Sequence, residues 1–335
     1  AKLFSKASKN TPLLAAGYFI FGYAMTLALT EKLETRHPLL LAPMAFVAGG
    51  RLAAAVSEAG GLGFIGGGYG DSKWLEQEFR EAGDARVGVG FITWTLKRQP
   101  ALLDEVLKQR PAAVWLSFGD PELYVQSIRS AGALLVCQVQ TVEDALRAKA
   151  VGADVIVAQG TEAGGHGADR ALSALLPDVA DAVAPVPVVA AGGIADARGV
   201  QAALALGASG VAVGTRLFAT QEALGHPNAK QALVEKTGAD TVRSRVFDLI
   251  RGYDWPQPYT GRTLRNDFLE RWLGREAQLE ANLAEEQQHY QAAVAVGDTR
   301  TMVVSAGEGL DLIHDLPPAA EVVARLMEGV TPWLS

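Results

Sequence analysis

Between residues 37 and 220, eight short apolar runs alternate with segments whose apolar residues recur at the spacing of a helix. Continuous apolar runs of this length predict strands that are buried on both faces, as in parallel sheets. The predicted strands cover residues 37–43, 62–65, 87–92, 112–116, 133–139, 154–158, 186–190 and 210–213. The predicted helices cover residues 50–59, 73–82, 101–109, 122–130, 142–151, 171–184 and 196–206, with a short helix after residue 215.

Eight such units in about 180 residues predict an α/β fold, a (β/α)8 TIM barrel. A doubly wound parallel sheet would give the same local pattern and is the structural alternative. The count of eight units favours the barrel.

The strand pattern stops at residue 221, and residues 221–300 are predicted to form a helical subdomain. A Gly/Pro/aromatic break is expected at residues 251–261, followed by one long helix over residues 266–296. Leu279, Leu283 and Tyr290 give this helix an apolar stripe. The barrel is assigned to residues 28–220, and residues 301–335 are predicted to return to it and to add a last helix at 317–327.

Residues 1–27 form an apolar N-terminal extension. The stretch 11–30 is mostly apolar and follows three lysines, which resembles a signal anchor or a membrane span. It also contains Pro12, Gly17 and Gly22 and has no clear cleavage site, so a helix packed on the domain or a non-native extension is favoured. Membrane contact through residues 11–30 is the minor alternative to a cytoplasmic protein.

The composition excludes several classes of function. A formal net charge of −7 without a basic cluster argues against nucleic acid as the main partner. The single Cys137 lies in an apolar run and excludes an internal disulfide framework and a cysteine-based zinc site. The five histidines are scattered, so no metal site is predicted.

The glycine-rich stretch from Gly160 to Gly167 follows the sixth predicted strand and contains His166. Glycines let the backbone turn sharply and approach a ligand closely, and loops after strands often carry chemistry. His166 is therefore the first candidate for an acid/base residue. Glu162 and Asp169 flank it, and either could orient the imidazole, although two solvated carboxylates are the favoured interpretation.

Two further loops predict a phosphate site. Gly192 and Gly193 follow the seventh strand, and Gly214 and Thr215 follow the eighth, where a short helix begins. In barrels these two loops commonly bind phosphate, because glycines leave backbone N–H groups accessible and a helix N-terminus favours an anion. With His166 after strand six, the arrangement suggests a phosphorylated cofactor across the barrel mouth. FMN has a suitable length, but spacing alone does not identify it.

Several motifs together resemble those of nitronate monooxygenases, formerly called 2-nitropropane dioxygenases. They are Leu40-Leu-Ala-Pro-Met-Ala45, Ala55-Val-Ser-Glu-Ala-Gly-Gly-Leu-Gly63, Gly160-Thr-Glu-Ala-Gly-Gly-His-Gly167, Ala190-Ala-Gly-Gly-Ile-Ala-Asp196, Val213-Gly-Thr-Arg216 and Ser305-Ala-Gly-Glu-Gly309. The resemblance runs from about residue 28 to the C-terminus. It implies a barrel with non-covalent FMN and a helical subdomain over the active site.

The resemblance also assigns residues. It makes His166 the catalytic histidine, and it places Pro43 and Met44 beside the flavin ring, with Gln138 as a polar contact from strand five. Its remaining cofactor contacts are the cradle residues Gly192, Gly193, Gly214 and Thr215, together with Gly165 and Ser305. Many bacterial members carry an asparagine where this chain has Gly90, which puts that flavin contact in doubt.

The implied activity is oxidation of small nitronates or nitroalkanes by O2 to carbonyl compounds and nitrite. His166 would act as the general base or steer the anionic substrate. The Glu-Ala-Gly-Gly-His sequence is also similar to that of FMN-dependent enoyl-acyl-carrier-protein reductases, and an NAD(P)H:quinone reductase is a third alternative. A flavin-binding protein without turnover is the alternative from a different class.

Overall fold

A parallel sheet closed into a barrel forms the centre of the molecule, in a computed structural model that describes residues 25–330. Its strands lie in the order β1-β9-β8-β6-β5-β4-β3-β2. A bridge between Leu40 and Leu62 joins the two outer strands, and the Leu41 N–H donates to the Leu62 carbonyl at 3.0 Å. The predicted (β/α)8 barrel is confirmed, and the doubly wound alternative is wrong. The strands are β1 (Leu39–Leu41), β2 (Gly63–Gly68), β3 (Val87–Ile92), β4 (Ala113–Ser117), β5 (Leu134–Val139), β6 (Val155–Gln159), β8 (Val188–Ala191) and β9 (Gly210–Val213).

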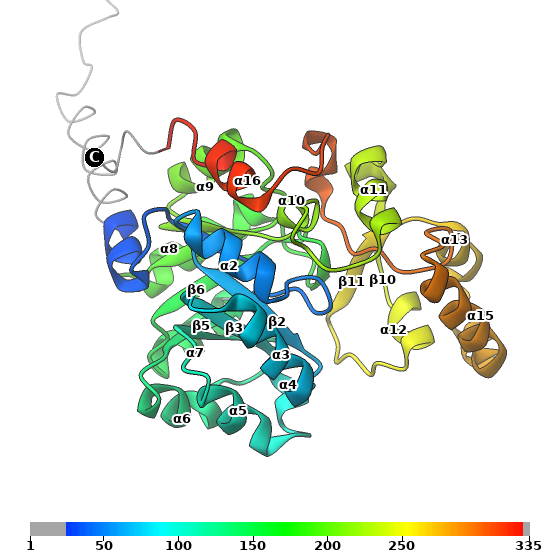
Figure 1. Cartoon of the computed structure of the whole chain (residues 1–335), viewed down its shortest axis with the longest axis horizontal. Coiled ribbons are helices and arrows are strands. Elements are labelled where there is room, and N and C mark those ends of the chain that lie inside the picture. Colours follow the sequence, from blue (N-terminus) through cyan, green and yellow to red (C-terminus); the bar gives the residue numbers. More distant parts are fainter. Residues whose placement is uncertain (1–24, 331–335) are drawn as a thin grey trace, which may run out of the picture.

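Helices cover the outside of this barrel (Figure 1). Their apolar faces pack on the strands in one large buried cluster, which explains why the strands are apolar on both faces. The helices are α2 (Gly50–Glu58), α3 (Ser72–Ala82), α4 (Thr93–Leu96), α5 (Pro100–Leu107), α6 (Val125–Ser130), α7 (Val142–Ala150), α8 (Leu172–Val183), α9 (Ala197–Ala205), α10 (Thr215–Phe218), α11 (Pro227–Glu235) and α16 (Ala319–Leu326). Three short 3₁₀ turns lie at Glu122–Tyr124, Gly238–Asp240 and Glu308–Leu312.

A helix over residues 25–33 packs against the interior of the barrel. Its Leu29 and Leu33 are fully buried in the same cluster as Leu40 and Trp115. A Cβ added at Gly210, the first residue of β9, would lie 2.6 Å from Leu29, so this helix covers the amino ends of the strands. Residues 11–24 of the predicted apolar segment lie outside the described residues. Within residues 25–330, the structure contains no helix with the length and apolar character needed to cross a membrane.

A second, three-stranded antiparallel sheet was not predicted. It consists of β7 (Gly165–Gly167), β10 (Thr241–Ser244) and β11 (Thr260–Leu264), in the order β10-β11-β7. Two of these strands belong to residues 221–300, which the sequence indicated to be helical. The third belongs to the stretch around His166, which was expected to be a loop. The strands are short and rich in Gly, Thr and Arg, so they lack the apolar signal of the barrel strands.

The helices of residues 246–296 lie to one side of the barrel (Figure 1). The prediction of one long helix over residues 266–296 is wrong. The chain forms three helices there, α13 (Asp267–Trp272), α14 (Glu276–Ala281) and α15 (Leu283–Val296). One break contains Gly274 at φ +75°, a conformation that favours glycine. These helices and α12 (Val246–Arg251) share a separate apolar core that includes Phe247, Phe268 and Tyr290.

Candidate active site

A cavity of about 550 Å³ lies where the carboxyl ends of the barrel strands face the three-stranded sheet. Its volume is in the range usual for small-molecule and cofactor sites. The structure brings every predicted site residue to this one cavity. The lining includes Pro43, Met44, Gln138, Gly165, His166, Gly192, Gly193, Gly214, Thr215 and Ser305.

The turns after β8 and β9 present unpaired backbone donors to the cavity. Gly192 and Gly193 have φ values of +125° and +69°, which side chains other than hydrogen rarely permit. Within residues 25–330, no hydrogen bond is donated by the N–H groups of Gly192, Gly193 or Gly214. The Thr215 hydroxyl accepts from the Gly307 N–H at 3.0 Å and retains its own proton for donation. This wall of the cavity is therefore suited to an anion with several oxygens.

The turn after β1 occupies the space beside Gly90. A Cβ added at Gly90 would lie 2.2 Å from the Pro43 Cβ and 2.4 Å from its Cγ. An asparagine at this position would therefore collide with the Pro43 ring. In this chain the apolar Pro43 ring forms the cavity wall beside Gly90.

Three glutamines link the barrel strands to the strand that carries His166. The Gln159 Oε1 accepts from the Nε2 of Gln138 at 2.9 Å and from the Nε2 of Gln140 at 2.7 Å. The Gln159 Nε2 in turn donates to the His166 carbonyl at 3.0 Å. Because these bonds fix the Gln138 Nε2 as a donor to Gln159, the Gln138 Oε1 remains an acceptor on a residue that lines the cavity.

His166 lies on β7 and is paired with Gly261 of β11. Its Nε2 is 2.8 Å from the Asp248 Oδ1, and the side chains are 14% and 4% exposed, respectively. The Trp255 ring stacks on the imidazole with a centroid distance of 3.5 Å. His166 is therefore held by a strand, a carboxylate and an indole, while its edge still reaches the cavity.

Burial lowers the pKa of His166 below its ordinary value near 6.5. The hydrogen bond and the negative charge of Asp248 oppose this shift, whereas Arg251 and Arg243 add to it. The imidazole is consequently neutral at physiological pH, which is the form that accepts a proton.

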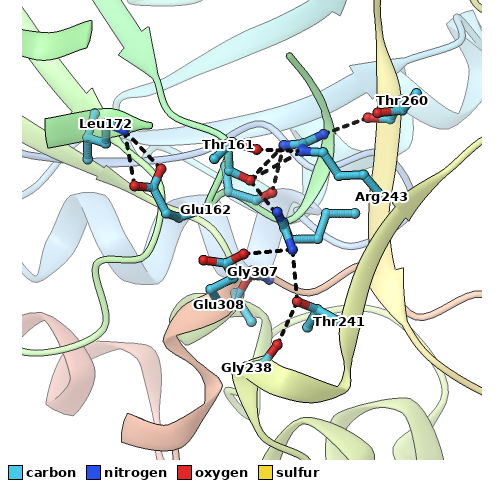
Figure 2. Close-up of polar contacts among 12 residues, drawn as sticks. Thr161, Glu162, Leu172, Gly238, Thr241, Arg243, Thr260, Gly307 and Glu308 are labelled. Carbon is cyan, nitrogen blue, oxygen red and sulfur yellow. Dashed lines mark hydrogen bonds and ion pairs between the residues drawn. The ribbon is translucent and has the colours of Figure 1, made fainter. Parts of the chain in front are cut away.

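Arg243 of β10 holds the stretch before His166 in place (Figure 2). Its guanidinium donates to the Thr161 carbonyl at 3.0 Å, to the Ala163 carbonyl at 3.2 Å and to the Thr260 carbonyl at 2.7 Å. Burial and the neighbouring Arg262 lower the pKa of Arg243 to about 10, which leaves it charged. The glycine-rich stretch is thus anchored to both β10 and β11.

The two carboxylates next to His166 in the sequence have other roles. Glu162 accepts from the Leu172 N–H at the start of α8, with oxygen distances of 3.0 and 3.1 Å, so the expectation that it is solvated is wrong. Asp169 is exposed, as expected. The partner of the imidazole is Asp248, which lies 82 residues further along the chain.

Sequence reasoning missed Asp248, Gln159, Arg251 and Trp255, all of which lie at or beside the cavity. Trp255 lies inside the aromatic break predicted at residues 251–261, and Gln159 lies at the end of the sixth strand, so position alone could have indicated both. Asp248 and Arg251 lie one turn apart on α12, without a recognisable local motif.

Comparisons with known proteins identify the family of the chain. The family model described as nitronate monooxygenase matches residues 26–88 and 92–329. A nitronate monooxygenase of Neurospora crassa is 34% identical over 88% of this chain and 89% of its own length. The solved structure of nitroalkane oxidase from Streptomyces ansochromogenes is similar with a TM-score of 0.77 and 31% identity, covering 92% of this chain and 100% of that one. FabK from Thermotoga maritima has the same TM-score and identity, covering 91% and 96%. The chain belongs to the nitronate monooxygenase family, a family of oxidoreductases.

Proposed function

We propose that this protein binds FMN and uses O2 to oxidise nitronates and nitroalkanes to carbonyl compounds and nitrite. The observation that carries the proposal is the cavity itself. It combines a largely buried, neutral histidine with a wall of backbone N–H groups that donate no hydrogen bond within residues 25–330, and both lie at the carboxyl ends of the barrel strands. The family to which the chain belongs supports the choice of a nitro compound as substrate.

The residues present fit a flavin mononucleotide. The free N–H groups of Gly192, Gly193 and Gly214, with the Thr215 hydroxyl, would hold its phosphate. Pro43 and Met44 offer an apolar surface for the flavin ring, and the Gln138 Oε1 offers an acceptor for a ring N–H. Bound there, the flavin would supply the electron transfer between substrate and oxygen.

His166 would remove the proton from the carbon next to the nitro group. Its lowered pKa keeps the imidazole unprotonated and ready for this step. A substrate that arrives already as the nitronate needs no base, and His166 then only positions the anion. The guanidinium of Arg251 also lines the cavity and would attract either the nitronate or the nitrite product.

The subdomain formed by residues 221–300 would cover this active site. It supplies both Asp248 and Trp255 to His166, so the site is incomplete without it. The closed environment would keep bulk water away from the imidazole, consistent with its lowered pKa.

One assay panel tests the proposal. The purified protein is expected to be yellow and to release FMN on denaturation. In an oxygen electrode it should consume O2 with ethyl nitronate or nitroethane and release nitrite. Rapid oxidation of NADH with an enoyl thioester, without oxygen uptake on nitronates, would instead assign the enoyl reductase activity that the motif also resembles.

A further inference from the structure

We propose that Asp248 is a positioning residue that fixes the proton of His166 on Nε2, so that Nδ1 accepts the proton of the substrate. The proposal rests on the proposed function for its substrate, but its claim about the imidazole is independent of it. The geometry that carries it is the 2.8 Å contact between the His166 Nε2 and the Asp248 Oδ1.

The chemistry of the two groups determines the direction of this bond. An ionised carboxylate oxygen can only accept, and a neutral imidazole has one nitrogen that donates and one that accepts. With Asp248 as the acceptor, Nε2 is the donor and Nδ1 holds the lone pair. No hydrogen bond to Nδ1 is formed within the part of the chain that the structure describes, so this lone pair is available to a ligand in the cavity.

Trp255 and β11 limit the positions that the imidazole can adopt. The indole lies 6° from parallel to the imidazole, and the opposing residue on β11 is Gly261, whose Cβ position would be 3.6 Å from Nε2. The backbone of His166 is held by β11 and by Gln159. The imidazole of His166 thus contacts Asp248 through one edge and lines the cavity with another.

The side chain of Asp248 makes no other hydrogen bond within residues 25–330. Its Oδ2 is buried and has no hydrogen-bond partner within residues 25–330. A buried oxygen without a donor destabilises the folded state, and such groups often mark functional sites. The residue is also rigidly placed, because Val246, Phe247 and Ile250 anchor α12 in the apolar core of the subdomain.

The proton-transfer step is balanced without any further reactant. The C–H bond next to the nitro group breaks and its proton goes to Nδ1 of His166. The electron pair moves into the C–N bond, and negative charge moves onto a nitro oxygen, giving a nitronate and an imidazolium. Asp248 stabilises the imidazolium through the hydrogen bond at Nε2.

Several other groups affect the titration of this pair. Arg251 lies on the same helix as Asp248, and Arg243 approaches from β10; both disfavour the imidazolium. The Tyr69 hydroxyl accepts from the Trp255 indole N–H at 3.1 Å, and burial raises the pKa of Tyr69, which keeps it neutral. Asp248 is the group that favours the imidazolium, so its replacement should lower the pKa of His166 further.

The first test measures the tautomer directly. Nitrogen-15 NMR of histidine-labelled protein with bound FMN, with His166 assigned through a His166→Gln variant, should show Nε2–H in the wild type. In Asp248→Asn the amide can donate to Nε2, and the Nδ1–H form should appear. An Nδ1–H tautomer in the wild type would overturn the proposal, whether or not nitro compounds are substrates.

The second test uses kinetics with a matched control. Asp248→Asn should reduce kcat/KM for nitroethane by roughly 10²- to 10⁴-fold, the usual contribution of a general base, and should shift the acid limb of the pH profile downward. For preformed ethyl nitronate, kcat/KM should fall by less than about tenfold, because no proton is removed. Asp267→Asn, an exposed aspartate of the same subdomain, makes the same charge change and should leave both rates unchanged.

Equal losses on both substrates, with FMN still bound, would overturn the positioning role. So would an unchanged rate with nitroethane. If Asp248→Asn fails to fold, the wild-type tautomer still decides the proposal. A wild type that is inactive on every nitro compound but carries Nε2–H would reject the proposed function and retain the assignment of the imidazole proton.

Discussion

Trp255 lies flat against His166, with ring centroids 3.5 Å apart and planes 6° from parallel. Trp255 is itself 2% exposed and contacts Trp94, Phe118 and Tyr259 edge to face. The aromatic cluster therefore removes water from one face of the imidazole. This contact explains why the environment disfavours the charged imidazolium although a carboxylate lies beside it.

Replacing Trp255 should change the pH dependence of catalysis. In Trp255→Ala the imidazole gains water, and the pKa of His166 should rise towards its ordinary value. Because the neutral form is the proposed base, activity with nitroethane should then be lost at a higher pH than in the wild type. The check is the acid limb of kcat/KM against pH.

Trp255→Phe is the matched control for this experiment. It keeps an aromatic ring over the imidazole but replaces the indole with a smaller phenyl ring, which lacks the N–H that bonds to Tyr69. Its acid limb should stay close to that of the wild type. An acid limb in Trp255→Ala that does not move, or that moves downward, would show that the indole does not control the pKa of His166.

Thr215 provides a test of the phosphate cradle. Thr215→Val keeps the shape but removes a hydroxyl that could donate to the phosphate. Hydrogen bonds to charged groups contribute roughly 1.5–3 kcal/mol, so the Kd for FMN should rise about tenfold or more. Flavin fluorescence quenching measures this Kd, and Thr215→Ser should bind as the wild type does.

Riboflavin binding distinguishes the loss of a phosphate contact from a general disturbance of the cavity. It lacks the phosphate, so Thr215→Val should bind it as well as the wild type does. An equal loss of affinity for FMN and for riboflavin would argue against a phosphate at Thr215.

Arg243 provides a test of the anchor that holds the stretch before His166. Arg243→Met leaves the buried carbonyls of Thr161, Ala163 and Thr260 without their charged donor. The free energy of unfolding should fall by roughly 3 kcal/mol or more, as measured by chemical denaturation. Arg198→Met removes an arginine whose side chain is 78% exposed. This variant should change the free energy of unfolding by less than about 0.5 kcal/mol. Similar values for the two variants would contradict the proposed anchor.

Gly90 tests the packing of Pro43. In Gly90→Asn the added Cβ would lie 2.2 Å from the Pro43 Cβ. Overpacking of this kind costs about 1–3 kcal/mol, so thermal unfolding should occur at a lower temperature. Gly199→Asn makes the same change where the atom nearest to the added Cβ lies 3.4 Å away, an ordinary contact, and should be tolerated. A fully stable Gly90→Asn protein with unchanged FMN affinity would mean that Pro43 moves aside readily.

The sequence predicted the barrel because each of its strands is buried on both faces and must be apolar throughout. It did not predict β7, β10 and β11, whose residues are mostly glycines, threonines and arginines held by cross-strand bonds and by arginine side chains. It placed Gly192, Gly193 and Gly214 at the cavity because glycine turns after strands leave a strong local pattern.

Asp248 illustrates what sequence reasoning could not provide. Its contact with His166 joins positions 82 residues apart, and the carboxylates nearer in sequence made the more obvious partners. Glu162 is used instead to bind the first N–H of α8. Only the pairing of β7 with β11, and the position of α12 that follows from it, brings Asp248 to the imidazole.

The most direct test of the central claim is the ratio of oxygen-uptake rates of wild type and His166→Asn on two substrates. With nitroethane, where a proton must be removed, the variant should be slower by roughly 10²-fold or more. With preformed ethyl nitronate, from which the proton has already been removed, the rate of the variant should fall by less than about tenfold. Equal activity of the two proteins on both substrates would contradict the account and remove His166 from the reaction.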